Sequence, residues 1–222
     1  MGKRRRNNAP KALKWALGVL LLCTAGTLFY CFPPFRIVPL DAAKQQQEKE
    51  TFDPKAFAKD FWNEKLMKSL GLALQASELL PAIRGDPKTA RNQYSHGWGI
   101  GSDYYYFLRG GGRVVSVGAD SVSLSLRGDD SAVDISIAIS NIFGNAIRNG
   151  SGLIDVSDFE NSQDLNNVSL EINRIVEQKV LPPFREKVAV GSKVRFVGCA
   201  EIMDEDSDLY PMRIIPILLE VQ

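Results

Sequence analysis

Gly144, Asn145 and Arg148 form a short segment whose residue types could bind an anion. Glycines on both sides of the arginine permit tight backbone turns, and a guanidinium fork matches a carboxylate or a phosphate. In the alternative interpretation, Arg148 pairs with Asp155 or Asp158 and stabilises an irregular loop. The three residues are therefore candidate ligand-binding residues, provided that the fold leaves them open.

His96 is the single histidine of the chain and lies close to Trp98 in a glycine-rich segment. Both are candidate ligand-binding residues. Catalysis by His96 would need a nucleophile or carboxylate beside it, and the sequence has no G-x-S-x-G elbow. One histidine without neighbouring cysteines is a weak metal site. We predict no catalytic residue, no metal and no cofactor, with a loop histidine bonded to the backbone as the alternative.

Asp204, Asp206 and Asp208 alternate, which suits the oxygen ligands of calcium. The glycine and the distal glutamate of an EF-hand are missing, however. We therefore expect a solvated loop between the last two strands. In small β-barrels such a loop often flanks the ligand face. Its negative charge would repel the phosphates of a nucleic acid, so binding of nucleic acid is disfavoured.

Four consecutive aromatic residues, Tyr104–Phe107, could stack against a sugar or a base. Strand alternation would place two of the rings in the core and two outside. Core or interdomain packing is the alternative. Gly110–Gly112 should turn the chain after this strand, and they lack the helix and Lys-Ser/Thr of a phosphate-binding loop.

Period-two patterns from Arg113 onward predict strands, with one helical pattern among them. The order is strand, strand, strand, helix, strand, strand, which is typical of an OB-fold, a five-stranded partly open barrel. Pro182-Pro183 should end the helix. Pro216 cannot donate to a ladder, so its strand should be an open edge or contain a bulge. An up-and-down barrel or a small sandwich competes, but neither explains the single helix as well. The patterns lie at 115–117, 122–126, 133–139, 168–176 (the helix), 194–202 and 212–221.

Before the barrel, Asp53-Pro54 carries a capping residue followed by a proline suited to a first helical turn. Gly71 should end or interrupt this helix. Further helices are expected at Leu72–Ile83 and Pro87–Tyr94. These helices would form a neck between the membrane and the barrel.

The N-terminus joins a basic head, residues 1–14, to an uncharged apolar segment, Trp15–Phe32. As a helix this segment approaches the hydrocarbon thickness of a bilayer, about 30 Å. It predicts a single-pass anchor in the cytoplasmic membrane with the N-terminus inside. A cleaved signal peptide is the alternative, with a weak cleavage pattern at Thr24–Gly26. Cys23 and Cys31 lack the small preceding residue of a lipid-attachment site.

The predicted domains are the head (1–14), the anchor (15–32), a stalk and helical neck (33–96) and the barrel (97–222). The fold class is therefore α+β. The net charge is +1 with the basic excess in the head, so the outer part offers no broad basic face for nucleic acid. Three cysteines give no disulfide framework, and Cys199 should be a small core residue.

Several segments together resemble the DUF2291 family of predicted bacterial periplasmic lipoproteins. The resemblance covers most of residues 35–222. It implies an extracytoplasmic, membrane-attached accessory protein without established activity, often encoded beside sugar transport systems of the ATP-binding-cassette type. The chain departs from the family in its poor lipid-attachment sequence. The matching segments are Phe52–Phe57, Phe61-Trp62, His96–Gly101, Tyr106–Gly110 with Gly112, Gly144–Arg148, and Ile154–Phe159 with Asn161.

We therefore predict a non-enzymatic accessory protein, held at the membrane, that contacts transporter components or a solute-binding protein. A second hypothesis is direct binding of a sugar or other small solute by the barrel face. The third is a hydrolase-type enzyme, which would need His96, Arg148 and a carboxylate within hydrogen-bond reach.

Overall fold

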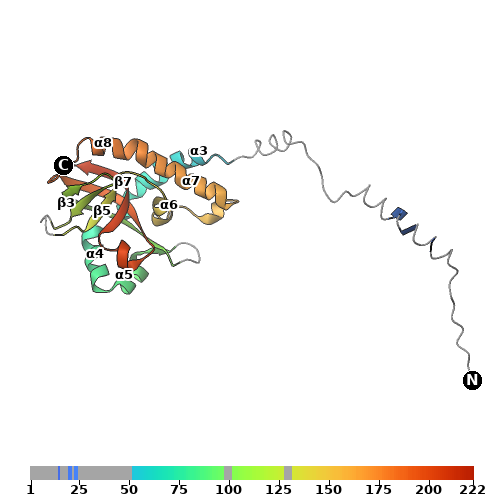
Figure 1. Cartoon of the computed structure of the whole chain (residues 1–222), viewed down its shortest axis with the longest axis horizontal. Coiled ribbons are helices and arrows are strands. Elements are labelled where there is room, and N and C mark those ends of the chain that lie inside the picture. Colours follow the sequence, from blue (N-terminus) through green and yellow to red (C-terminus); the bar gives the residue numbers. More distant parts are fainter. Residues whose placement is uncertain (1–14, 16–19, 22, 25–51, 98–101, 128–131) are drawn as a thin grey trace, which may run out of the picture. The chain divides into compact units, whose positions relative to one another are not determined.

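The structure, a computed structural model, describes residues 15, 20–21, 23–24, 52–97, 102–127 and 132–222 (Figure 1). The basic head, the stalk before residue 51, most of Trp15–Phe32 and the whole of Trp98 lie outside them. Among the residues described, no helix is long and apolar enough to cross a membrane. Phe52–Gln222 forms one compact unit, and the domain boundaries given above stay predictions.

A barrel of antiparallel and parallel pairings forms the centre of this unit. β3 pairs with β4, β4 with β5, β5 in parallel with β7, and β7 with β6; β6 then returns to β3 and closes the barrel. Within the described ranges the sheet has seven strands, because two short ones are added to β3. The predicted α+β class and the OB-like order of strands and helix are confirmed. The strands are β1 (Leu74–Gln75), β2 (His96–Gly97), β3 (Tyr104–Val117), β4 (Ser121–Ser125), β5 (Ile135–Ala138), β6 (Lys193–Ile202) and β7 (Met212–Val221).

β3 is one continuous strand, so the expected turn at Gly110–Gly112 is wrong. These glycines instead let β3 pass closely between its neighbours. A Cβ at Gly110 would lie 3.0 Å from the ring of Phe196, and a Cβ at Gly112 would lie 2.8 Å from the carbonyl oxygen of Ser125. The strand can therefore pair with β6 along its first part and with β4 along its last part.

The bulge expected at Pro216 is present. The register between β6 and β7 shifts at Val197/Gly198, and Gly198 lies opposite Pro216. A Cβ on Gly198 would lie 2.5 Å from the carbonyl oxygen of Ile215, which is shorter than any real contact. β7 lies between β5 and β6 and is not an edge strand, although its pairing with β5 covers only Met212–Ile214 and ends before Pro216.

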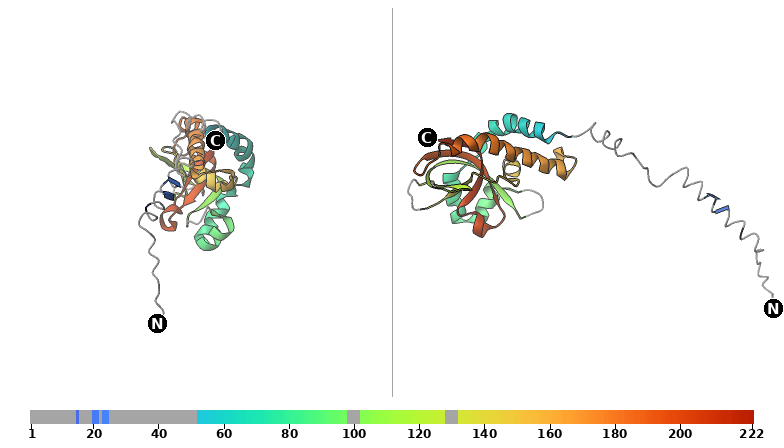
Figure 2. Two further views of the ribbon diagram at one scale, coloured as in Figure 1. Left: turned by 90° about the vertical axis from the view of Figure 1, so that its right-hand side faces the viewer. Right: turned by 45° about the horizontal axis from the view of Figure 1, so that its top comes forward.

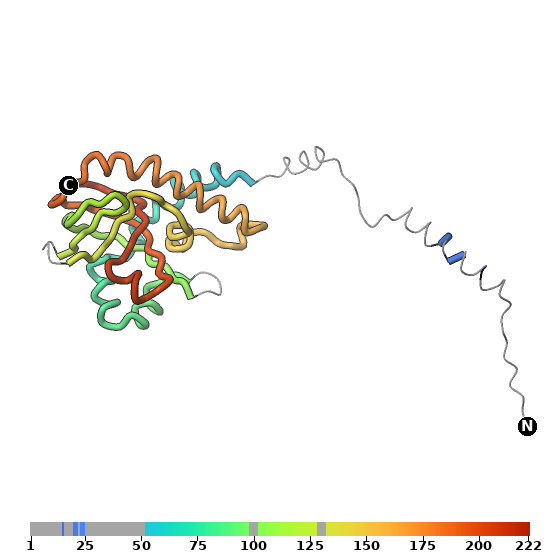
Figure 3. The backbone as a smooth tube through the Cα atoms, in the orientation of Figure 1, coloured from blue at the N-terminus to red at the C-terminus, as the bar shows by residue number. Residues whose placement is uncertain are grey.

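Helices cover the barrel on two sides (Figures 1 and 2). α3 lies along α7, although the two are far apart in the sequence (Figure 3). α4 and α5 pack on the opposite side, where Arg84 of α4 forms an ion pair with the buried Asp134. The helices are α3 (Pro54–Asp60), η1 (Phe61–Leu66), η2 (Met67–Leu72), α4 (Ala76–Gly85), α5 (Pro87–Tyr94), α6 (Ala146–Gly150), η3 (Val156–Asp158), α7 (Ser162–Ile175), η4 (Val176–Val180), α8 (Leu181–Arg185) and α9 (Glu205–Asp208).

The sequence correctly predicts the start of one helix but not the end of another. Asp53 caps α3, because its carboxylate accepts hydrogen bonds from the backbone N–H groups of Lys55 and Ala56. Pro182-Pro183 does not end the helical run, which continues to Arg185. The prolines lie in the first turn of α8, directly after η4, a wide π-turn that interrupts the regular α-helical hydrogen-bond pattern.

Replacing Gly198 with alanine tests the close approach of β6 to β7. The new methyl group would meet a carbonyl oxygen that the barrel holds in place, so we expect Gly198→Ala to lower the free energy of unfolding by about 1–3 kcal/mol. Urea unfolding of the full chain measures this. Gly85→Ala is the control, because a Cβ at Gly85 would have no atom within 4 Å. Equal stability of the two variants would contradict the bulge geometry.

Candidate functional site

The first residues of β3 carry the polar groups of the candidate site. Tyr104, Tyr105, Tyr106 and Phe107 are all buried. The interpretation as packing residues is therefore confirmed, and the expectation that two rings face outward is wrong. The reason is that β3 has the barrel interior on one side and packed elements on the other. The hydroxyls of Tyr104 and Tyr105 nevertheless reach carboxylates, in two separate groups of residues.

The first group, here the Tyr105 cluster, consists of Tyr105, Arg148, Asn149 and Glu201. The hydroxyl of Tyr105 donates to Oε1 of Glu201 at 2.8 Å. Burial, and then this hydrogen bond, raise the pKa of Tyr105 to about 12. Burial lowers the pKa of Arg148, and the charges of Tyr105 and Glu201 partly oppose that effect. An arginine nonetheless stays charged at neutral pH.

Arg148 holds α6 against α7. It is 4% exposed, its Nε donates to Oδ1 of Asn149 at 2.8 Å, and one terminal nitrogen donates to the carbonyl oxygen of Leu165 at 3.2 Å. Asp155 accepts from the backbone and hydroxyl of Ser157 instead. The structure therefore agrees better with the alternative interpretation, in which Arg148 stabilises the local fold. Its hydrogen-bond partners are a backbone carbonyl and asparagine side chains, in place of the expected aspartates.

The fold brings three other predicted residues to the Tyr105 cluster. The half-buried Asn145 precedes α6, and a Cβ on Gly144 would lie 3.3 Å from Oε2 of Glu201. His96 pairs with Tyr105 across β2 and β3, and a Cβ on Gly152 would lie 3.3 Å from the His96 ring. Trp98 lies outside the described residues. His96 is exposed on a short strand and makes no side-chain hydrogen bond to the described part of the chain, which differs from the expected loop histidine.

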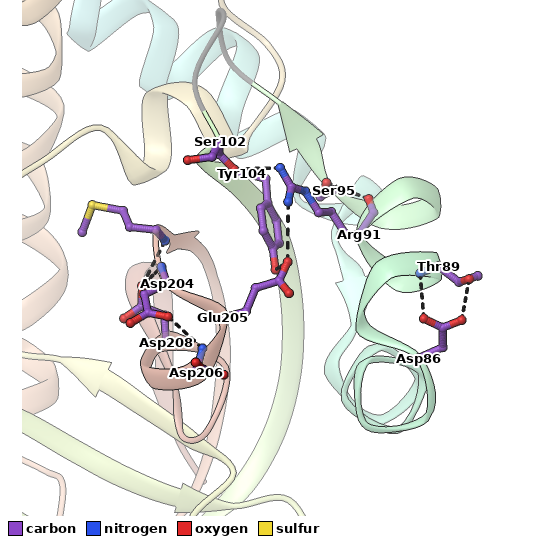
Figure 4. Close-up of polar contacts among 11 residues, drawn as sticks. Asp86, Thr89, Arg91, Ser95, Ser102, Tyr104, Asp204, Glu205, Asp206 and Asp208 are labelled. Carbon is purple, nitrogen blue, oxygen red and sulfur yellow. Dashed lines mark hydrogen bonds and ion pairs between the residues drawn. The ribbon is translucent and has the colours of Figure 1, made fainter.

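The second group, here the Tyr104 cleft, lies between α5 and α9 (Figure 4). The guanidinium of Arg91 lies 4.3 Å from the centroid of the Tyr104 ring and donates to the carbonyl oxygen of Ser102 at 2.8 Å. The same arginine approaches Oε1 of Glu205 at 3.5 Å. The Tyr104 hydroxyl donates to this oxygen at 3.1 Å. Two partners therefore hold the Glu205 carboxylate in place.

The Tyr104 cleft has a volume of about 510 Å³. Lys88, Asn92 and Met203 complete its lining. Burial, followed by the charge of Tyr106, raises the pKa of Tyr104, so its hydroxyl stays a donor at physiological pH. The cleft thus offers hydrogen-bond donors together with a carboxylate acceptor, a combination suited to a ligand with several hydroxyl groups.

The alternating aspartates lie at and within α9, outside the lining of the cleft. Asp204 caps α9 by accepting from the backbone N–H of Asp206 at 3.0 Å. Asp208 accepts from the N–H groups of Met203 and Asp204. The carboxylates of Asp204 and Asp208 thus accept backbone hydrogen bonds. The segment that was expected to be a solvated loop contains a short helix, α9. Among the described residues, no group of three His, Cys, Asp or Glu side chains is placed to hold a metal.

Sequence reasoning missed Arg91, Glu201 and Glu205 as site residues, and it considered Tyr105 only as a ring for stacking. Arg91 and Glu205 lie in unrelated polar segments, and no motif connects them. A signal did exist for Glu201, because this charged residue follows the uncharged run Phe196–Ala200 within the predicted strand. Cys199, expected in the core, is fully buried there, and burial raises the pKa of its thiol.

Alkaline titration tests the environment of Tyr105. Because its pKa is about 12 in the folded chain and about 10 in the unfolded chain, unfolded chains lose the proton first. The contribution to stability is therefore complete below pH 10 and is lost as the pH rises through 12. We expect urea unfolding of Tyr105→Phe to show a pH slope shallower than wild type by up to about 1.4 kcal/mol per pH unit in this range. Identical slopes would show that Tyr105 titrates as an exposed residue.

Comparison with known proteins gives a family and a fold. The family model DUF2291, described as "predicted periplasmic lipoprotein", matches residues 21–220. No curated protein sequence matches the chain. The crystal structure of an OB-fold protein from Thermotoga maritima is similar, with 30% sequence identity and a TM-score of 0.70 over 78% of this chain and 100% of that chain. This chain therefore belongs to the DUF2291 family, whose description supports an extracytoplasmic location.

Proposed function

We propose that the chain is a non-enzymatic binding module that works outside the cytoplasmic membrane and serves a sugar transport system. The Tyr104 cleft carries this proposal, because it is a polar, solvent-open site of ligand size whose carboxylate is already positioned. The family description of periplasmic lipoproteins supports the location. The role in sugar transport follows the resemblance described above and is our inference.

The cleft suits a sugar or a similar small solute with several hydroxyl groups. Its volume of about 510 Å³ lies within the range of small-molecule sites, about 300–1,000 Å³. Arg91, Lys88 and Asn92 supply donors, while Glu205 supplies a charged acceptor. A ligand hydroxyl that both donates and accepts can use one group of each kind.

A non-enzymatic role agrees with the arrangement of the titratable groups. In the described part of the chain, the His96 side chain has no hydrogen bond to a carboxylate or a nucleophile, so no acid–base pair is assembled there. The carboxylates of Glu201 and Glu205 each accept a hydrogen bond from a tyrosine hydroxyl. A hydrolase is therefore the weaker hypothesis.

For attachment we propose the single-pass anchor at Trp15–Phe32, with the basic head in the cytoplasm. This uncharged apolar segment supports the proposal, as does the poor sequence context of Cys23 and Cys31 for lipid attachment. An anchored module stays near transporters in the same membrane.

Sugar binding at the Tyr104 cleft is tested by thermal unfolding of the full chain in detergent against a panel of monosaccharides. A ligand that binds the folded state raises its stability, and each kcal/mol corresponds to about 2–4 °C for a protein of this size. We expect at least one sugar to raise the melting temperature at millimolar concentration. Glu205→Gln should weaken binding about tenfold or more, because it removes a charged acceptor.

Asp206→Asn is the matched control for that experiment. It changes an exposed carboxylate on the same short helix, outside the lining of the cleft. Its melting-temperature shift with sugar should equal that of the wild type. A panel without any shift, or equal binding by Glu205→Gln, would remove the Tyr104 cleft as a sugar site.

The transport role is tested by affinity capture from membranes. After a carbonate wash, which removes proteins without an anchor, detergent extracts of the tagged chain should contain transporter components or a solute-binding protein. The control is a tagged chain that keeps residues 1–51 and carries an unrelated outer domain. Release of the protein by carbonate would contradict the anchor. Recovery of the chain alone, or equal recovery with the control, would contradict the partnership.

A further inference from the structure

A second cleft, the Arg109 cleft, lies away from α5 and α9, between the turn of η2 and the barrel wall. It has a volume of about 430 Å³. Arg109 and Gly111 of β3, Arg195 of β6, and Leu70 and Leu218 belong to its lining. Gln75 of the short strand β1, which pairs with Arg109, lies at the same edge.

Arg109 has no partner for its charge among the described residues. Its Nε is buried and makes no hydrogen bond to any described group, and no ion pair involves it there. A desolvated donor without an acceptor lowers stability. Arrangements in which the guanidinium fork meets an acceptor are therefore favoured, and the adjoining cleft is the space into which the fork can turn.

The charge of the Arg109 cleft is positive. No aspartate or glutamate belongs to its lining, which is drawn from described residues. Arg195, the second arginine, pairs with Glu220 at 3.0 Å, which offsets its charge. Arg109 thus remains the dominant charge, and its fork matches the oxygens of a carboxylate or phosphate.

Apolar surface lies beside this charge. Leu70 and Leu218 are half-buried and so keep exposed surface at the cleft, next to the buried Phe196 and Val197. An inorganic ion would use the guanidinium and leave this surface in water. A ligand that carries an apolar portion would cover it and gain from the removal of that surface from water.

We propose that the Arg109 cleft is a second binding site, which takes a small organic anion with its phosphate or carboxylate on Arg109 and its apolar portion against Leu70 and Leu218. The site is separate from the Tyr104 cleft. The proposal for the Arg109 cleft does not depend on the sugar-binding role proposed above, so a negative result for one site would not contradict the other.

The test is calorimetric titration of the full chain in detergent with butyl phosphate, pentanoate, inorganic phosphate and butanol. We expect saturable binding of butyl phosphate or pentanoate, or of both, and the stronger ligand identifies the anionic group. Inorganic phosphate and butanol should each bind at least about tenfold more weakly, because each lacks one of the two interactions. Equal affinity for inorganic phosphate would remove the apolar part of the proposal, and absence of binding by both organic anions at millimolar concentration would overturn it.

Variants separate this site from general ion binding and from partition into detergent. Arg109→Met should abolish anion binding, whereas Arg113→Ala, an exposed arginine on the same strand outside the cleft, should leave it unchanged. Gly111→Val should block the cleft while the chain still folds, because its Cβ would have ordinary contacts, the nearest at 3.5 Å. Anion binding by Arg109→Met or Gly111→Val with wild-type affinity would overturn the proposal.

Stability without ligand gives an independent readout. Arg109→Met removes an unpaired buried donor and keeps an unbranched apolar stem, so we expect its melting temperature to rise by about 2–4 °C. Anions should then stabilise the wild type but not this variant. A lower melting temperature for Arg109→Met would show that the guanidinium stabilises the fold itself and would contradict a role in ligand binding.

Discussion

The pairing of β3 along both of its edges is the constraint on which the rest of the structure depends. Its residues from Tyr104 to Arg113 pair with β6, and those from Arg113 to Val117 pair with β4. One strand thus closes the barrel. Such a strand must bend past its neighbours, and Gly110 and Gly112 permit this because a side chain at either would meet a packed group.

Barrel closure also positions both polar sites at the start of β3. Because adjacent residues of a strand point to opposite faces, Tyr104 and Tyr105 reach different surroundings. One hydroxyl binds Glu205 of α9 and the other binds Glu201 of β6. The same strand carries Arg109 further along, beside the second cleft. A single strand therefore supports all three groups, as the proposed binding role requires.

The sequence predicted the barrel because its signals are local. Alternation at 115–117, 122–126 and 133–139 follows from strand periodicity. Pro216 indicated a bulge or an open edge because it lacks a backbone donor. The behaviour of Gly110–Gly112 was not predictable in this way. A run of glycines is typical of a turn, and only the approach of Phe196 and Ser125 explains a strand.

The site was less predictable than the fold for a physical reason. Arg148, Gly144, Asn145 and His96 were chosen from local composition, and the fold does place them around Tyr105. Their partners, Glu201 and Leu165, come from distant segments that join them only when the barrel closes. The Tyr104 cleft depends on α5 and α9 meeting beside β3, and neither helix carries a motif that indicates this.

Hydrogen–deuterium exchange of the full chain in detergent, with and without the best-binding sugar, tests the central claim most directly. A ligand in the Tyr104 cleft should slow amide exchange in α5, in the first residues of β3 and in α9, and leave β4 and β5 unchanged. Protection in β4 and β5 alone, or none in any of these elements at a saturating concentration, would contradict a binding module built on the start of β3.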